Sequence, residues 1–143
     1  MTPEQVYLAA REWVGVPYHH QGRVPAGLDC VGLLIVVARE LGIIPAHFDY
    51  TRYGRRPNGQ LDAALDEHLV PLDDPQPGCI VAIAWHRRLH HVGIVGQTDQ
   101  YLTLIHALDP VGVIEHRLDE KYRRRIVKCY GYSGVTYQEL AHV

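Results

Sequence analysis

The stretch GLDCVGLLIVVARELG, residues 27–42, sets a cysteine at the first position of an almost wholly apolar run. Asp29 is expected to cap a helix here and Gly42 to end it. Apolar residues recur at helical spacing and also occupy the remaining faces: Leu33, Leu34, Ile35, Val36, Val37, Ala38 and Leu41. A helix that is apolar on nearly every side is buried at the centre of a fold. The stretch therefore predicts a central helix with Cys30 at its N-terminus.

The rest of the chain places helices before strands. Thr2, Pro3 and Gln5 predict the start of a first helix, and Gly15 and Pro17 predict its end. A further helix is expected from about Gly59 to Leu69. After residues 73–78 (DDPQPG) come short β-branched runs: CIVAIAW (79–85), HVGIVG (91–96), YLTLIHA (101–107), VGVIEH (111–116) and RIVKCYGY (125–132). Their spacing is too short for helical crossovers. We therefore predict an α+β fold, with N-terminal helices on an antiparallel sheet of about five to six strands.

Length and charge narrow the function classes. The chain has 143 residues, so we expect one domain over residues 1–143. A net charge of −2 argues against a nucleic-acid partner. Three cysteines are too few and too scattered for a disulfide framework. The N-terminus lacks the order of a secretory signal, and no apolar run is long enough for membrane insertion. We expect a soluble product, synthesised in the cytoplasm without an export signal of its own.

Cys30 is the first candidate for chemistry. A free cysteine is most often a small core hydrophobe. At the first turn of a helix, however, unpaired N–H groups favour the reactive thiolate, and Gly32 would let a substrate backbone come close. Asp29 opposes this effect, because its charge disfavours a second negative charge nearby. This position, together with a histidine partner, predicts a nucleophile with a lowered pKa, whereas Cys79 and Cys129 lie in strand-like core segments.

A cysteine nucleophile needs a base and a group that orients the base. His91 opens one predicted strand and His106 lies near the end of the next, so antiparallel pairing would make them neighbours. Alternation allows only one of His90 and His91 to face the cysteine. His91 shares its face with Gly93, which would leave room for the cysteine helix. His90 shares its face with Val92 and Ile94, so the preference for His91 is mild.

The order of motifs resembles a known family. WVGVPY, GLDCVGL, PGCIVAIAW, HHVGIV and LIHA, spread from about Trp13 to His116, are similar to the NlpC/P60 cysteine peptidases. Residues 17–33, PYHHQGRVPAGLDCVGL, look most like the phage-tail cell-wall peptidases. The resemblance implies a papain-like fold with the cysteine helix packed on an antiparallel sheet. It also implies hydrolysis of peptidoglycan stem peptides, typically between γ-D-glutamate and the diamino acid, with no cofactor and no metal.

The resemblance also assigns roles. Cys30 corresponds to the nucleophile, His91 to the base and His106 to the residue that orients it. Tyr18 corresponds to an active-site tyrosine with an oxyanion or positioning role, although a packed surface tyrosine would be equally ordinary. Asp29 matches an aspartate that can help bind the amine end of the substrate. The HHVGIV motif favours His91 over His90 as the base.

Three departures from the family pattern concern substrate detail. Val31 stands where the family usually has serine, and Gly78-Cys79 replaces a customary Gly-Asp. The interval between His91 and His106 is slightly longer than usual, consistent with the GQTDQ turn at residues 96–100. None of these changes touches Cys30, His91 or His106.

Three alternatives are open. The first is metal binding by Cys30 with several histidines, namely His19, His20, His86, His90 and His91. No pair of these residues has the spacing of a structural zinc site. The second is acyl transfer or lipid deacylation, which relatives of similar fold perform with the same Cys–His pair. The third is a structural tail protein with an occluded or vestigial site. The reading we adopt is a peptidoglycan-cleaving peptidase, a component of a phage or phage-like tail tip, delivered by the particle to the periplasm or cell wall with tail-tip proteins as partners.

Overall fold

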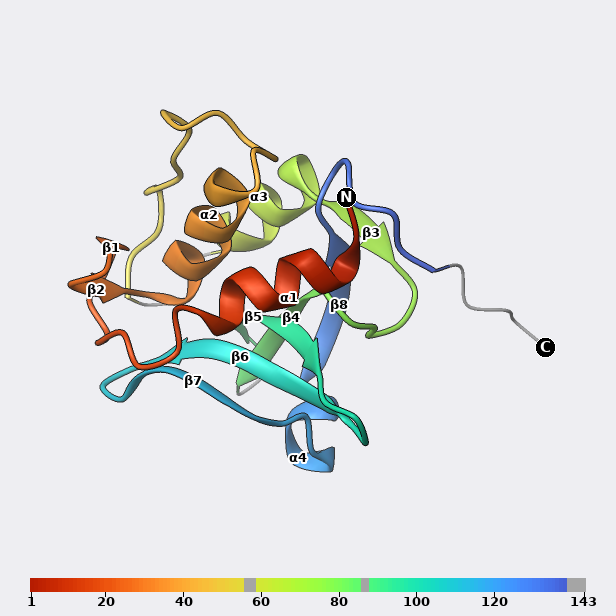
Figure 1. The fold of residues 1–143 in the computed structure, drawn as a ribbon. Helices are drawn as coiled ribbons and strands as arrows, with labels where there is room; N and C mark the ends of the chain where they lie inside the picture. The colour runs from red at the N-terminus through yellow and green to blue at the C-terminus, as the bar shows by residue number, and fades with distance from the viewer. Residues whose placement is uncertain (56–58, 86–87, 139–143) are drawn as a thin grey trace.

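A six-stranded antiparallel sheet forms the centre of the computed structural model, which describes residues 1–55, 59–85 and 88–138, without the side chains of 88–90 (Figure 1). The strand order is β3-β8-β4-β5-β6-β7. The strands are β3 (Val70–Leu72), β4 (Ile80–Trp85), β5 (Arg88–Gln97), β6 (Leu102–Leu108), β7 (Gly112–Arg117) and β8 (Ile126–Gly131). Strands β4 to β7 follow one another as a meander. Strand β8 returns to lie between β4 and β3 and pairs with both.

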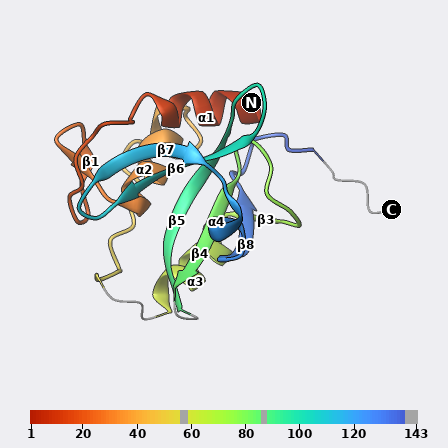
Figure 2. The ribbon, with the colours of Figure 1, turned by 90° about the horizontal axis from the view of Figure 1, so that it is seen from below.

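Three helices cover one face of this sheet, and a fourth, short helix lies at the opposite face (Figures 1 and 2). They are α1 (Pro3–Arg11), α2 (Cys30–Glu40), α3 (Gln60–His68) and α4 (Glu120–Arg123). A small hairpin of β1 (Arg23–Val24) and β2 (Gly27–Leu28) precedes α2. The hairpin brings Asp29 to the helix start, where its carboxylate accepts a hydrogen bond from the Gly32 N–H at 2.8 Å.

Alternation along the strands divides the buried residues into two clusters. The first lies between the helices and the sheet and includes Ile80, Val92, Ile94 and Ile105 with the apolar residues of α2. The second lies on the opposite face and consists of Cys79, Val81, Ile83, Val95, Leu104, Leu118 and Cys129. Helix α2 packs against this sheet and against α1, and its residues 31–38 are all buried, which explains why its surface is apolar nearly all round.

The predicted α+β architecture is confirmed. The Thr2 capping box starts α1, Asp29 caps α2, and α3 occupies the expected segment. The five predicted strands are all present, and α1 ends at Arg11, before the Gly15 and Pro17 signals. Sequence patterns missed β1, β2, β3 and α4, which have two to four residues each and are too short for a periodic signal. Within the described ranges, no helix is long and apolar enough to cross a membrane.

Candidate active site

His91 and His106 meet across neighbouring strands. The ladder between β5 and β6 pairs Ile94 with Ile105, and one further step of that register places His106 opposite Gly93. His91 is two residues beyond, a diagonal position that aromatic side chains can span. The His91 Nε2 and His106 Nδ1 atoms are 2.6 Å apart, and both side chains are buried. The predicted proximity of these histidines is confirmed, while their catalytic roles stay predictions.

Gly93, two residues after His91, makes room for different groups from those expected. A Cβ on Gly93 would lie 2.7 Å from Leu104 Cδ1 and 3.1 Å from His106 Cβ. Gly93 therefore makes room for the side chains of β6, and the prediction that it admits the cysteine helix is wrong. Val92 and Ile94, on the alternate face, are the residues packed in the cluster that contains α2. The side chain of His90 lies outside the described residues.

Cys30 lies at the start of α2, partly exposed, and its thiol is close to β5. The backbone N–H of Val92 hydrogen-bonds to it, which places the sulfur beside the peptide that follows His91. The Val92 nitrogen is itself only about 2.4 Å from the His91 Cα. The fold thus brings the thiol to the chain position where the candidate base is attached.

The pKa of the Cys30 thiol differs from the expectation. Burial, the largest cause, and the neighbouring Asp29 charge together raise it to about 12. The N–H groups of Val92, Val31 and Cys30 itself lower it, as expected at a helix N-terminus, but they do not outweigh desolvation. The prediction that the helix N-terminus and a histidine partner lower the pKa of Cys30 is therefore wrong. Any thiolate at neutral pH must depend on a proton acceptor such as an imidazole.

Asp29 is the centre of a buried hydrogen-bond cluster. Only 1% of its surface is exposed. Its two carboxylate oxygens accept from four groups: Gly32 N at 2.8 Å, Arg23 Nη1 at 3.1 Å, Gln21 N at 2.7 Å and Tyr53 Oη at 2.7 Å. Four donors match the usual capacity of a carboxylate. An amine from substrate would have to displace one of these donors, so the assignment of Asp29 as an amine-binding residue stays a prediction.

Gly32 belongs to the same cluster. A Cβ at this position would collide with the Gly22 carbonyl oxygen and would lie 3.0 Å from Arg23 Nη1. The missing side chain accommodates the hairpin before α2. The expectation that Gly32 opens space for a substrate backbone is therefore wrong, because the space is filled by the protein itself.

Tyr18 is half-buried and lies near the thiol. Burial, the largest cause, together with the charges of Cys30 and Asp29, raises the pKa of its phenol to about 12. An isolated bridge pairs Tyr18 with Leu28, which holds the tyrosine beside the segment that leads into Cys30. At neutral pH the phenol keeps its proton and can donate a hydrogen bond to an oxygen that develops negative charge. This location is compatible with the predicted oxyanion or positioning role.

A third histidine, which sequence reasoning did not select, extends the pair. His116 on β7 places its Nε2 2.8 Å from the Nε2 of His106, and its Nδ1 lies 2.8 Å from the carbonyl oxygen of Arg117. The β6–β7 register pairs Ile114 with His106, so alternation puts His116 on the same face. The register of this hairpin would have revealed it. The three-residue connection at 109–111 does not fix that register from sequence alone.

The ring of Tyr122, on α4, packs against this histidine row. Its centroid is 5.5 Å from that of His106 and 4.8 Å from that of His116. Burial, the largest cause, together with the nearby His91 and His116, lowers the pKa of His106 to about 3. His106 is therefore neutral at physiological pH. It can act as a hydrogen-bonding bridge and not as a charge.

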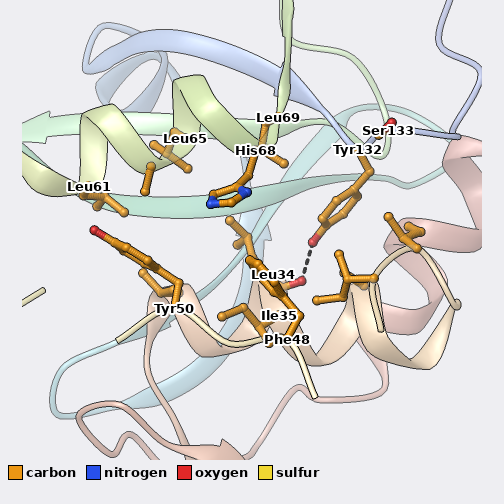
Figure 3. Close-up of a pocket in the computed structure, with 15 residues that line it drawn as sticks. Leu34, Ile35, Phe48, Tyr50, Leu61, Leu65, His68, Leu69, Tyr132 and Ser133 are labelled. Carbon is orange, nitrogen blue, oxygen red and sulfur yellow. Dashed lines mark hydrogen bonds between the residues drawn. The ribbon is translucent and has the colours of Figure 1, made fainter. Parts of the chain in front are cut away.

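An apolar pocket of about 150 Å³ lies between α2 and α3 (Figure 3). Its lining includes five residues from the segment of α3 and its C-cap: Leu61, Ala64, Leu65, His68 and Leu69. In Figure 3 the Tyr132 hydroxyl donates a hydrogen bond to the Leu34 carbonyl at one side of the pocket. Val31, which replaces the usual serine, also lines it. None of the three histidines of the row does.

Cys79, at the position of the customary Gly-Asp, is fully buried at the end of the second core cluster. Its sulfur accepts a hydrogen bond from the Gln76 N–H at 3.4 Å, and burial raises its pKa to about 12. The sulfur of Cys79 thus makes a hydrogen bond within the turn at the position where the family usually has a carboxylate. Among the described residues, no three His, Cys, Asp or Glu side chains are grouped as metal ligands. His86, part of the metal alternative, lies outside those residues.

The comparison with protein families decides which family this is. The sequence model of the NlpC/P60 family matches residues 15–131, most of the chain. The chain belongs to the NlpC/P60 family. This is a family of cysteine peptidases, and the match extends past the resemblance seen between Trp13 and His116. Among curated proteins, no sequence matches the chain.

Solved NlpC/P60 structures share the fold. The NlpC/P60 domain of the peptidoglycan hydrolase SagA superposes with a TM-score of 0.61 at 17% identity, covering 92% of this chain and 99% of that domain. An NlpC/P60 protein from Bacillus cereus gives 0.65 at 18% identity, covering 92% of this chain and 40% of that one. A lipoprotein-like NLP/P60 protein from Staphylococcus aureus gives 0.59 at 20% identity, with 91% and 41% covered. The chain thus spans about two-fifths of the length of the latter two.

Proposed function

We propose that this NlpC/P60 chain is a cysteine endopeptidase that hydrolyses peptidoglycan stem peptides. The observation that carries the proposal is the hydrogen-bonded pair of His91 and His106 beside the Val92 N–H that contacts the Cys30 thiol. Nucleophile, base and orienting group are the parts that acyl transfer to a thiol requires. The peptidoglycan substrate is supported by the name of SagA, a peptidoglycan hydrolase of the same fold.

The resting site in this proposal holds a neutral thiol and a neutral imidazole, because burial and Asp29 keep the Cys30 pKa near 12. His91 takes the thiol proton as the sulfur attacks the scissile carbonyl. The imidazolium then gives that proton to the leaving amine, and a thioester remains on Cys30. Water, deprotonated by His91, hydrolyses the thioester and restores the thiol. Each cycle therefore consumes one water and releases one carboxyl and one amine product.

Oxyanion stabilisation in this scheme comes from donors around the sulfur, at the start of α2 and on β5. The N–H groups that already lower the Cys30 pKa, those of Val92, Val31 and Cys30, are directed at the sulfur and its surroundings. The protonated Tyr18 phenol supplies a further donor near the sulfur. Such fixed donors stabilise the tetrahedral intermediate without reorganisation. The bond cleaved is, in our proposal, the one between γ-D-glutamate and the diamino acid, which the family resemblance supports.

Delivery by a phage or phage-like tail tip is part of the same proposal. Its support is the similarity of residues 17–33 to the phage-tail cell-wall peptidases. A tail-tip peptidase would reach the cell wall on the particle and would contact other tail-tip proteins. Mass spectrometry of purified particles from the producing cells should then recover the chain. Recovery only in cell extract, with none in particles, would contradict this part.

The enzymatic proposal is tested by incubating purified muropeptides with the protein and analysing the products by mass spectrometry. Wild type should release a fragment with a new amino terminus on the diamino acid. Cys30→Ala should release none, whereas Cys129→Ala, a buried cysteine on β8, should match wild type. Cleavage that persists in Cys30→Ala, or a wild type that leaves every stem peptide intact, would refute the function.

A further inference from the structure

Three histidine rings from three neighbouring strands form one continuous hydrogen-bonded row. His91 on β5 contacts His106 on β6 at 2.6 Å, and His106 contacts His116 on β7 at 2.8 Å. The row ends where His116 Nδ1 meets the Arg117 carbonyl oxygen at 2.8 Å. We propose that His116 is a positioning residue, which fixes the ring tautomers of His106 and His91 so that His91 presents an unprotonated Nδ1.

The carbonyl at the end of the row determines the first proton. A carbonyl oxygen only accepts hydrogen bonds, so the Nδ1 of His116 must carry a hydrogen. With His116 neutral in this proposal, Nδ1 holds its one ring hydrogen, and its Nε2 is an acceptor. The donor in the contact between His116 and His106 is therefore the Nε2–H of His106.

The same reasoning passes through His106. This ring is fully buried and neutral, since burial lowers its pKa to about 3. With its hydrogen on Nε2, its Nδ1 accepts. The short contact with His91 then needs a hydrogen on His91 Nε2. In neutral His91 the remaining nitrogen, Nδ1, is unprotonated, and this is the tautomer that can accept a proton from Cys30.

Packing holds the row in this arrangement. Tyr122 lies against the rings of both His106 and His116, and Gly93 leaves space for the His106 side chain. If His116 lost its acceptor nitrogen, the Nε2–H of His106 would be buried without that partner. Moving the hydrogen to Nδ1 would relieve this cost. His106 would then donate to His91, whose own hydrogen would move to Nδ1, where it blocks proton acceptance.

The test compares His116→Leu with His116→Gln. Leucine fills the space without an acceptor, whereas the amide of glutamine can donate to the Arg117 carbonyl and accept from His106. His116→Leu should lower kcat for muropeptide cleavage by about 10- to 100-fold with little change in KM, and His116→Gln should recover most of the loss. His47→Leu, which replaces an exposed histidine, is the control and should match wild type.

The second readout does not need activity, which matters because the kcat readout rests on the proposed function. Nitrogen-15 spectra of ring-labelled histidines assign the tautomers directly. Wild type and His116→Gln should show His91 and His106 with hydrogen on Nε2, and His116→Leu should shift both toward Nδ1. A wild-type spectrum with the His106 hydrogen on Nδ1 would overturn the inference, whether or not the variants fold. An inactive wild type with the expected tautomers would refute only the proposed function.

Discussion

Replacing Asp29 by alanine should destabilise the protein by about 3 kcal/mol, because its carboxylate holds the start of α2 to the preceding hairpin. Removing an N-cap side chain costs about 1 kcal/mol. Breaking a buried ion pair from one side costs about 3–5 kcal/mol. The Arg23 side chain is only 9% exposed, so the pair counts as buried. Arg23 keeps a second carboxylate, Asp49 at 2.8 Å, which places the expected loss near the lower end.

The measurement is urea unfolding followed by circular dichroism, extrapolated to zero denaturant. Asp119→Ala is the matched control. Asp119 also caps a helix, accepting from the Tyr122 N–H at 3.0 Å, but it is exposed and belongs to no buried cluster. It should cost about 0.5–1 kcal/mol. If Asp29→Ala loses no more than Asp119→Ala, the buried cluster does not stabilise the fold as argued.

Asp29→Asn separates the structural role from substrate binding. The amide keeps the shape but replaces one acceptor oxygen by a donor. If Asp29 mainly stabilises the contact between the start of α2 and the hairpin, the variant should have a lower free energy of unfolding. The ratio of KM values for stem peptides with free and with blocked amino termini should then be unchanged. A stable variant that binds only the free-amine peptides more weakly would instead support the amine-binding assignment.

In His91→Ala, the rate at which iodoacetamide alkylates Cys30 should rise without inflection from pH 6 to 10. Burial and a nearby carboxylate hold the thiol pKa near 12 once the imidazole is gone. An inflection below pH 8 would contradict this. The buried His106, with its pKa near 3, binds fewer protons folded than unfolded, so wild type should lose up to about 1.4 kcal/mol per pH unit as pH falls below about 6.5. His106→Phe should remove that dependence in urea titrations, and an equally steep loss in the variant would refute the assignment. Gly93→Ala should cost about 1–3 kcal/mol and reduce turnover, since its Cβ would lie 3.1 Å from His106 Cβ. Gly54→Ala, with open space around it, should change neither quantity.

The local features of the site were readable from the sequence. A capping aspartate, an apolar 3.6-residue repeat and β-branched alternation each depend on neighbours a few residues away, so they predict α2 and the five long strands. Antiparallel pairing of two successive strands was enough to bring His91 to His106. Short elements such as α4 leave no periodic signal, yet α4 supplies Tyr122, whose ring packs on the histidine row.

The tertiary structure decided what each of these groups can do. The pKa of Cys30 depends on how much protein surrounds the sulfur, and no spacing rule gives that density. All hydrogen-bonding positions of the Asp29 carboxylate are filled, because Arg23 and Tyr53 reach it from outside α2. The space beside Gly32 and Gly93 is occupied by protein groups from other segments of the chain. His116 joined the site through the register of one hairpin. Sequence thus determined the elements and the candidate pair, whereas desolvation and long-range register determined the pKa of Cys30 and the place of His116, because both arise only when distant segments pack together.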